Sequence, residues 1–290
     1  MPNNPVHVGE AVAIGRGEPL VLIAGPCVIE SHELTLEIAE RLAEIGAELG
    51  MSIIFKASYD KANRSSIHGF RGPGLERGLR TLETARERSG LPLTTDVHES
   101  AQAGPVAEIC DLLQIPAFLA RQTDLIAAVA RTGKAMNVKK GQFMAPWDMK
   151  NVVTKAAECG NTNVLLTERG TTFGYGRLVN DMRAIPIMQE TGCPVVFDAT
   201  HSVQFPSGEG DRSGGERRMV PVLSHAAVAC GCDALFLEVH PRPDEAKSDG
   251  PNMLELDRLP QLLRECLRIR EALTLQPFLP IASCSLAGQS

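Results

Sequence analysis

Four potential metal ligands stand at or near the ends of apolar runs. Cys27 ends the run LVLIAGPC, His201 follows PVVFDAT, Glu238 lies in ALFLEVH, and Asp249 stands in the loop that comes next. A thiolate, an imidazole and two carboxylates suit zinc or iron(II), and the carboxylates also admit manganese. If these run ends lie side by side, they predict one divalent-metal site. Taken alone, Cys27 would more often be a buried structural thiol.

Lysine and arginine also gather at the run ends of an otherwise acidic chain. The formal net charge is −6 and the isoelectric point is about 5.7, which gives no support for a nucleic-acid partner or an anionic membrane. The cations in question are Lys56, Lys61, Arg64, Arg121, Lys139, Lys140 and Arg169. An isolated Lys is typically a solvated surface charge. A set of cations around one cavity favours an anionic substrate, because Arg offers a bidentate fork for phosphate or carboxylate.

Eight short β-like runs must position these residues. They begin near residues 20, 52, 92, 112, 135, 163, 194 and 234. Each starts apolar, as a strand covered on both faces does, and most become polar at the C-terminal end. Helix-period segments lie between them, such as 31–50, with Ser31 as N-cap and Gly50 near its end, and 256–273.

This alternation predicts a (β/α)8 barrel in one domain of residues 1–290, with an open doubly wound sheet as the alternative. The polar run ends favour the barrel, because its active site collects the C-terminal ends of many strands. The alternating segment 6–14 predicts a hairpin that closes the barrel floor. We expect the Gly-rich loops 61–74 and 205–218 to act as lids and the tail after about residue 274 to be loosely held.

Several function classes lack support. No apolar run approaches the roughly 20 residues of a membrane span, and the start MPNNPVHVGE lacks the pattern of a signal peptide, so we expect a cytoplasmic protein. The eight cysteines include no CxxC pair and are interpreted as reduced thiols. A GxxxxGKS/T phosphate loop, a dinucleotide fingerprint and a GxSxG elbow are absent from the sequence.

Nine stretches together resemble one known family. They are AGPCVIES, KASYDKANRSS, TDVHE, QIPAFLARQTD, NVKKGQF, LTERGTTFGYG, DATHSVQ, SGGERR and LEVHPRPDEAKSDGP. Over about residues 6–273 the chain resembles 3-deoxy-D-manno-octulosonate 8-phosphate synthase, or 2-dehydro-3-deoxyphosphooctonate aldolase. The resemblance implies a (β/α)8 barrel, usually a homotetramer, that condenses phosphoenolpyruvate with arabinose 5-phosphate and water. Inorganic phosphate is released, and the product serves lipopolysaccharide biosynthesis.

The resemblance also implies residue roles. Phosphoenolpyruvate would contact Lys56, Lys61, Lys139, Gln142, Arg169 and His201. Arabinose 5-phosphate would contact Asn63, Arg64, Ser65 and Arg121, and the space between the substrates would be lined by Asp96, His98 and Phe118. The candidate catalytic residues are His201, Asp249 and Lys139.

The family has two classes, which differ at the position of Cys27. Metal-dependent members have cysteine there and metal-independent members have asparagine. By this resemblance one divalent ion per subunit, zinc, iron(II) or manganese, would be held by Cys27, His201, Glu238 and Asp249. The Asp-Gly-Pro sequence that begins at Asp249 is, however, similar to that of metal-independent members.

Three other activities stay open. The sibling family, 3-deoxy-D-arabino-heptulosonate 7-phosphate synthase, uses erythrose 4-phosphate and usually has Lys-Pro-Arg where this chain reads Lys61-Ala62-Asn63-Arg64. Asn63 suits a longer sugar and favours the first family. A Schiff-base aldolase could use Lys139 or Lys140, and a non-catalytic barrel could sense phosphosugars without releasing phosphate.

Overall fold

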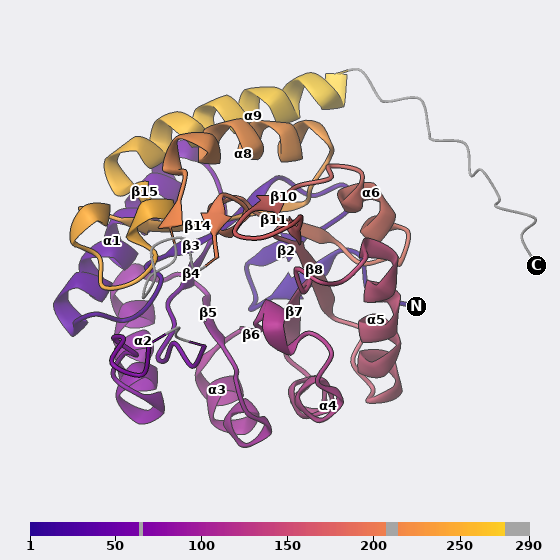
Figure 1. Cartoon of the computed structure of the whole chain (residues 1–290), viewed down its shortest axis with the longest axis horizontal. Coiled ribbons are helices and arrows are strands. Elements are labelled where there is room, and N and C mark those ends of the chain that lie inside the picture. The colour runs from indigo at the N-terminus through magenta and orange to yellow at the C-terminus, as the bar shows by residue number, and fades with distance from the viewer. Residues whose placement is uncertain (64–65, 207–213, 276–290) are drawn as a thin grey trace, which may run out of the picture.

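The parallel strands of the barrel come from the eight predicted apolar runs. The computed structural model describes residues 1–63, 66–206 and 214–275. Within these ranges Figure 1 shows the strands β3 (Val21–Gly25), β4 (Ile53–Lys56), β5 (Leu93–Asp96), β6 (Leu112–Ile115), β7 (Ala135–Lys139), β8 (Val164–Glu168), β11 (Val195–Asp198) and β14 (Ala234–His240). The barrel closes because β11 pairs with β8 and β14, and β14 pairs with β3. The predicted barrel is confirmed, and the open sheet is wrong.

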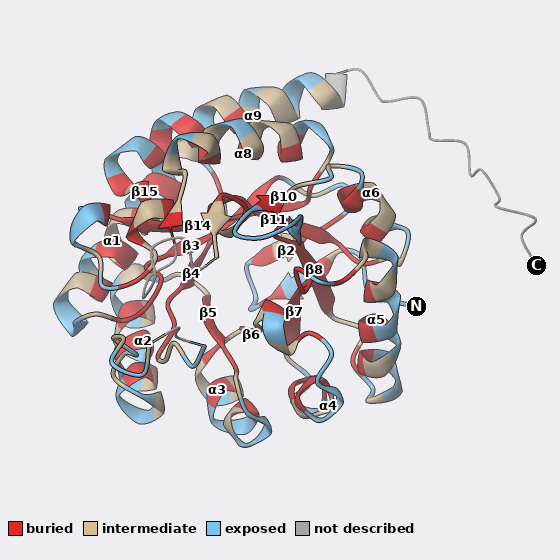
Figure 2. Cartoon of the chain, viewed as in Figure 1, coloured by how far each residue is buried: buried red, intermediate tan, exposed pale blue. Residues whose placement is uncertain are grey.

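Helices surround the barrel. They are α1 (His32–Leu49), α2 (Leu75–Ser89), α3 (Ala103–Ile109), α4 (Thr123–Arg131), α5 (Met149–Glu158), α6 (Ala184–Gln189), the short α7 (Ala199–Ser202), α8 (Val220–Ala229) and α9 (Leu259–Leu275). The predicted caps of α1 are present: Ser31 Oγ accepts from the Leu34 N–H at 3.2 Å, and Gly50 has a φ of 61°. Figure 2 shows the buried sides of these helices turned toward the strands.

The hairpin of β1 (Val6–Val8) and β2 (Val12–Ile14) closes the N-terminal end of the barrel, as predicted. Its apolar side chains form one buried cluster with inward residues of the barrel strands, among them Val21 and Ile23 of β3. The alternate residues Leu22 and Ala24 belong to the outer cluster under the helices. The hairpin covers the N-terminal end of the barrel, and the polar C-terminal ends of the strands lie at the opposite end, the mouth of the barrel.

Short strands lie in the segments that follow the barrel strands. β9 (Thr171–Thr172) pairs with β10 (Leu178–Val179), β12 (Gln204–Phe205) with β13 (Gly214–Gly215), and β15 (Leu254–Glu255) with β14. Residues 64–65, 207–213 and 276–290 lie outside the described ranges, so the lids, the loose tail and the single domain over 1–290 stay predictions. In the described ranges, none of the helices has the length and apolar character that a membrane span needs.

Candidate active site

A cavity of about 860 Å³ opens at the C-terminal ends of the barrel strands. Most of the predicted site residues line it: Lys56, Lys61, Asn63, Asp96, His98, Phe118, Lys139, Gln142, Arg169, His201 and Asp249. They come from distant parts of the chain, and the parallel strands bring them to one edge. These residues therefore share one polar cavity, where the strand ends of a barrel are expected to meet, and their roles stay predictions.

Two predicted cations lie elsewhere. Lys140 is fully buried and does not line the cavity; its Nζ donates to Thr171 Oγ1 at 3.0 Å and lies 3.5 Å from Glu168. Successive strand residues point to opposite faces, so Lys139 faces inward and Lys140 outward. Arg121 is exposed and also outside the cavity lining. Arg64 and Ser65 fall outside the described residues.

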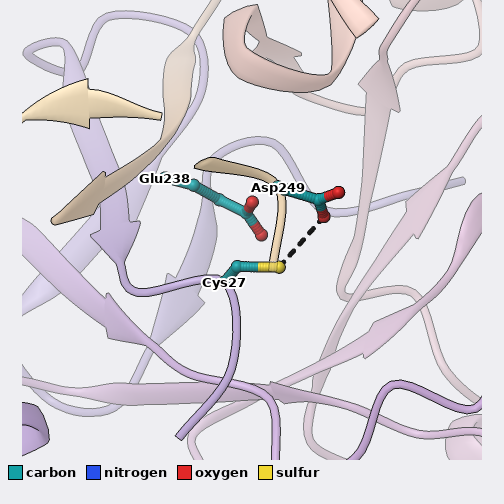
Figure 3. A group of neighbouring side chains, drawn as sticks. All are labelled: Cys27, Glu238 and Asp249. Atoms are coloured by element: carbon teal, nitrogen blue, oxygen red, sulfur yellow. Dashed lines mark hydrogen bonds between the residues drawn. The ribbon is translucent and has the colours of Figure 1, made fainter. Parts of the chain in front are cut away.

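Three of the four predicted metal ligands converge at the cavity, which Asp249 lines. Figure 3 shows Cys27, Glu238 and Asp249 pointing toward one another, and one ligand atom of each lies within 4.8 Å of the other two. Cys27 Sγ donates a hydrogen bond to Asp249 Oδ2 at 3.0 Å. Glu238 stands opposite Gly25 in the register of β14 and β3, so Cys27 follows only two residues beyond that pair.

The fourth predicted ligand, His201, stands beside this triad. It lies on α7, directly after β11, and its Nε2 is 3.8 Å from Glu238 Oε1. Its Nδ1 is 2.8 Å from Asp198 Oδ2. The group of potential ligands within 4.8 Å of one another contains the triad without His201.

The triad fits a divalent cation on two grounds. Glu238 Oε2 is buried and has no hydrogen-bond partner among the described residues, so it has coordination capacity to spare. Burial, with the negative charges of Asp249 and Glu238, raises the pKa of the Cys27 thiol. A divalent ion would favour the thiolate and compensate three acidic groups that crowd one buried place. The sulfur and carboxylate donors suit zinc or iron(II).

Lysines hold the Glu238 carboxylate of the triad in its ionised form. Lys56 Nζ donates to Glu238 Oε1 and to the Cys27 carbonyl, both at 2.9 Å. Burial by itself would raise the pKa of Glu238, but Lys56, His201 and Lys61 outweigh it and hold that pKa well below its usual range. Glu238 is therefore a carboxylate at neutral pH.

The sequence reasoning did not give Asp198 a role in the site. Its Oδ2 accepts from Lys139 Nζ at 2.6 Å and faces His201 Nδ1. Burial lowers the pKa of Lys139, and Asp198 opposes that shift. Lys139 Nζ also lies over the ring of Phe236, 3.5 Å from its centroid. The signal in the sequence was the spacing, because Asp198 ends its strand three residues before His201.

A chain of hydrogen bonds inside the barrel orients Asp96. Its Oδ1 accepts from Gln114 Nε2 at 2.7 Å, Gln114 Oε1 accepts from Asn137 Nδ2 at 3.0 Å, and Asn137 Oδ1 accepts from Thr167 Oγ1 at 2.6 Å. Ser58 donates to the other carboxylate oxygen. Polar residues within apolar runs, such as Gln114 and Asn137, were the overlooked sequence signal for this layer.

Four cavity residues carry buried polar atoms that lack a hydrogen-bond partner among the described residues. They are Arg169 Nη1, Gln142 Oε1, His98 Nδ1 and His201 Nδ1. Leaving such a group unpaired costs about 1–3 kcal/mol. A polar, anionic ligand would supply partners to the arginine, so these atoms are typical of a site that binds its substrate through them.

Comparisons with known proteins identify the family of this chain. A family model described as DAHP synthetase I family matches residues 3–274. A protein of Synechococcus sp. named 2-dehydro-3-deoxyphosphooctonate aldolase is 60% identical over 265 residues, which cover 91% of this chain and 93% of that protein. A protein of the same name from Geobacter sp. strain M21 is 59% identical, and the match covers 88% of this chain and 93% of that protein. Another, from Cyanothece sp., is 56% identical, and the match covers 92% of this chain and 98% of that protein. The resemblance drawn from the sequence is confirmed, and the chain belongs to the DAHP synthetase I family.

Proposed function

We propose that this protein condenses phosphoenolpyruvate with D-arabinose 5-phosphate and water to give 3-deoxy-D-manno-octulosonate 8-phosphate and inorganic phosphate, in lipopolysaccharide biosynthesis. The names of its relatives support this assignment. The observation that carries it is the cavity itself, where Lys61, Lys139 and the unpaired Arg169 Nη1 face one space. Two phosphate esters are the ligands that such a lining would bind.

The reaction joins C3 of phosphoenolpyruvate to the aldehyde carbon of arabinose 5-phosphate. The electron pair of the C2–C3 double bond forms the new bond, and the aldehyde oxygen takes a proton and becomes a hydroxyl. Water adds at C2 and gives up a proton, and the hemiketal phosphate then loses inorganic phosphate to leave a C2 ketone. Two anionic substrates must be held together throughout, and the cations of the cavity offset their repulsion.

Most of the predicted binding residues have a place in this proposal. Phosphoenolpyruvate would lie against Lys56, Lys61, Lys139, Gln142, Arg169 and His201, and the sugar phosphate would be bound by Asn63, Arg64 and Ser65. Arg121 lies outside the cavity lining and has no place in it. The space where the carbon chains meet would be lined by Asp96, His98 and Phe118. His201 is a candidate for proton transfer at Nε2, with its Nδ1 2.8 Å from Asp198 Oδ2. Asp249 is the second candidate for proton transfer.

The metal-dependent class is part of the same proposal. Cys27, Glu238 and Asp249 would hold one divalent ion, with His201 beside them. When bound, the ion would supply Lewis-acid polarisation of an oxygen or a lowered pKa for a coordinated water. Zinc, iron(II) and manganese are all compatible with these donors.

A homotetramer and a cytoplasmic location stay predictions of the family resemblance. Exposed aromatic side chains support self-association: Phe143, Trp147, Phe173 and Tyr175 stand on the loops after β7 and β8. Large exposed apolar groups on neighbouring loops are typical of protein interfaces. Sedimentation velocity on the purified protein measures the oligomeric state directly.

The decisive assay is phosphate release from phosphoenolpyruvate, with arabinose 5-phosphate and, separately, erythrose 4-phosphate. Each is measured before and after chelator treatment and after metal is added back. We expect activity with the five-carbon sugar alone, lost with chelator and restored by metal. Activity with erythrose 4-phosphate would instead favour the sibling reaction, which the family description also names. Substrate binding without phosphate release would favour a sensor.

Two variants refine this test. Cys27→Ala should abolish the metal add-back, whereas Cys266→Ala, which removes an equally buried thiol in α9, should keep it. A Schiff-base aldolase would be exposed by borohydride trapping with substrate, and chelation would leave it active. Chelator-resistant phosphate release in the wild type would refute the metal-dependent class and keep the reaction.

A further inference from the structure

The buried carboxylate of Glu30 lies near the metal triad and is not one of its ligands. Glu30 follows Cys27 by three residues, and only 7% of its side chain is exposed. Its Oε1 accepts a hydrogen bond from the backbone N–H of Lys247 at 2.9 Å, two residues before Asp249. This bond joins the segment after β3 to the loop after β14, which are 217 residues apart in sequence.

His240 brings the third ligand segment to the same place. It follows Glu238 by two residues on β14, and 3% of its side chain is exposed. Its Nδ1 accepts from the Arg242 N–H at 2.9 Å, which places the proton of the neutral ring on Nε2. Nε2 lies 3.8 Å from Glu30 Oε1 and has no hydrogen-bond partner among the described residues. The proton-bearing edge of the ring therefore faces the carboxylate.

The loop that carries Asp249 depends on such contacts. Between β14 and β15 it contains 3₁₀ turns, Pro243–Glu245 and Gly250–Asn252, and no α-helix. Asp249 itself has a φ of 51°, in the left-handed region that costs an L-residue energy. A ligand on such a loop keeps its position only if bonds from outside the loop hold the backbone.

We propose that Glu30 is a positioning residue for the metal triad. Its carboxylate fixes the backbone beside Asp249 to the segment that carries Cys27, so that both ligand atoms stay within reach of Glu238. This inference rests on the metal dependence proposed above. It adds a residue that lies outside the ligand set and acts through the Lys247 backbone.

The test measures metal affinity without turnover. Metal-free protein is titrated with Co²⁺, and the thiolate-to-cobalt absorption reports binding at Cys27, with a competing chelator to set the affinity. Glu30→Ala should weaken Co²⁺ binding about 10–100-fold, the usual effect of losing a group that supports a ligand. Glu30→Gln should bind nearly as tightly as the wild type, because its amide oxygen can still accept from the Lys247 N–H. Glu33→Ala, an exposed glutamate in the first turn of α1, is the matched control and should change nothing.

Two outcomes would overturn the role of Glu30. One is wild-type cobalt affinity in Glu30→Ala, which together with a lower melting temperature marks a purely structural residue. The other is an equal loss of affinity in Glu30→Gln. If Glu30→Ala does not fold, Glu30→Asp replaces it with the same expectation, because its shorter side chain withdraws the carboxylate from Lys247. A wild type that binds no Co²⁺ would overturn the metal dependence together with this proposal, so the two failures are distinguishable.

Discussion

The buried ion pair between Lys139 and Asp198 should be one of the most sensitive positions in the molecule. Lys139 Nζ and Asp198 Oδ2 are 2.6 Å apart, and their side chains are 7% and 0% exposed. The perturbation is Asp198→Asn, which keeps the shape of the side chain. Its single oxygen can replace Asp198 Oδ2 toward Lys139, and the amide NH2 then replaces Oδ1, which accepts from the His201 N–H at 2.9 Å and caps α7. The variant removes the negative charge and this cap, and leaves Lys139 buried without a counter-ion.

The size of the effect follows from the geometry. Two unit charges 2.6 Å apart attract by about 6 kcal/mol at an effective dielectric constant of about 20. The Asn oxygen still accepts from the ammonium, and a hydrogen bond to a charged group retains about 2 kcal/mol. We therefore expect Asp198→Asn to lower the free energy of unfolding by about 5 kcal/mol, of which the lost cap of α7 contributes about 1 kcal/mol, within the range found when one partner of a buried pair is removed.

Urea denaturation of four proteins checks this: the wild type, Asp198→Asn, Lys139→Met and the double variant. The double variant should recover at least about 2 kcal/mol relative to the sum of the single losses, because no buried charge is left unpaired. Asp181→Asn is the control, since its ion pair with Arg183 is 2.7 Å long but exposed, and should have no measurable effect. A loss below about 1 kcal/mol in Asp198→Asn, or a double variant without recovery, would refute the reasoning.

Three further predictions concern packing, acid stability and substrate affinity. Gly25→Ala should lower the free energy of unfolding, measured by thermal unfolding, by about 3 kcal/mol or more, because a Cβ there would lie 1.9 Å from the Lys56 carbonyl oxygen. The control is Gly104→Ala in α3, which has open space around it and should not destabilise the protein. The pKa values of Asp96 and Asp198 are lowered by neighbouring cations against the effect of burial, so the unfolded chain binds more protons. Stability should therefore be complete above about pH 4 and fall as the pH drops below it; equal urea midpoints at pH 7 and pH 3 would contradict this. Arg169→Lys should raise the KM for phosphoenolpyruvate about 10-fold or more, because one ammonium cannot replace two guanidinium nitrogens; an unchanged KM in the phosphate-release assay would remove Arg169 from the binding site.

Much of the fold was predictable because its signals are local. Each barrel strand formed within a predicted apolar run, and most of these runs ended in polar residues. Helix α1 began and ended at its predicted caps, Ser31 and Gly50. The hairpin at residues 6–14 was equally visible, since its alternation leaves Val6, Val8 and Ile14 buried. These features depend on neighbours in sequence, and a pattern in the sequence therefore indicates them.

The direction in which an individual side chain points was not predictable in the same way. Lys139 and Lys140 are chemically alike and adjacent, and only the register of β7 between β6 and β8 decides which one reaches the cavity. Asp198 gained its role from Lys139, which lies 59 residues away. Arg121 had the right charge at a run end, yet the loop after β6 leaves it exposed and outside the cavity lining.

By itself, the sequence determined the strand and helix periods, the polar run ends, and the family to which their combination belongs. Only the tertiary structure decided that Cys27, Glu238 and Asp249 meet at one cavity, that His201 stands beside them, and that Glu30 reaches the backbone at Lys247. The physical reason is the closure of the barrel. Once β14 pairs with both β3 and β11, the first and last parts of the chain become neighbours, and every contact between them depends on a register that no local pattern contains.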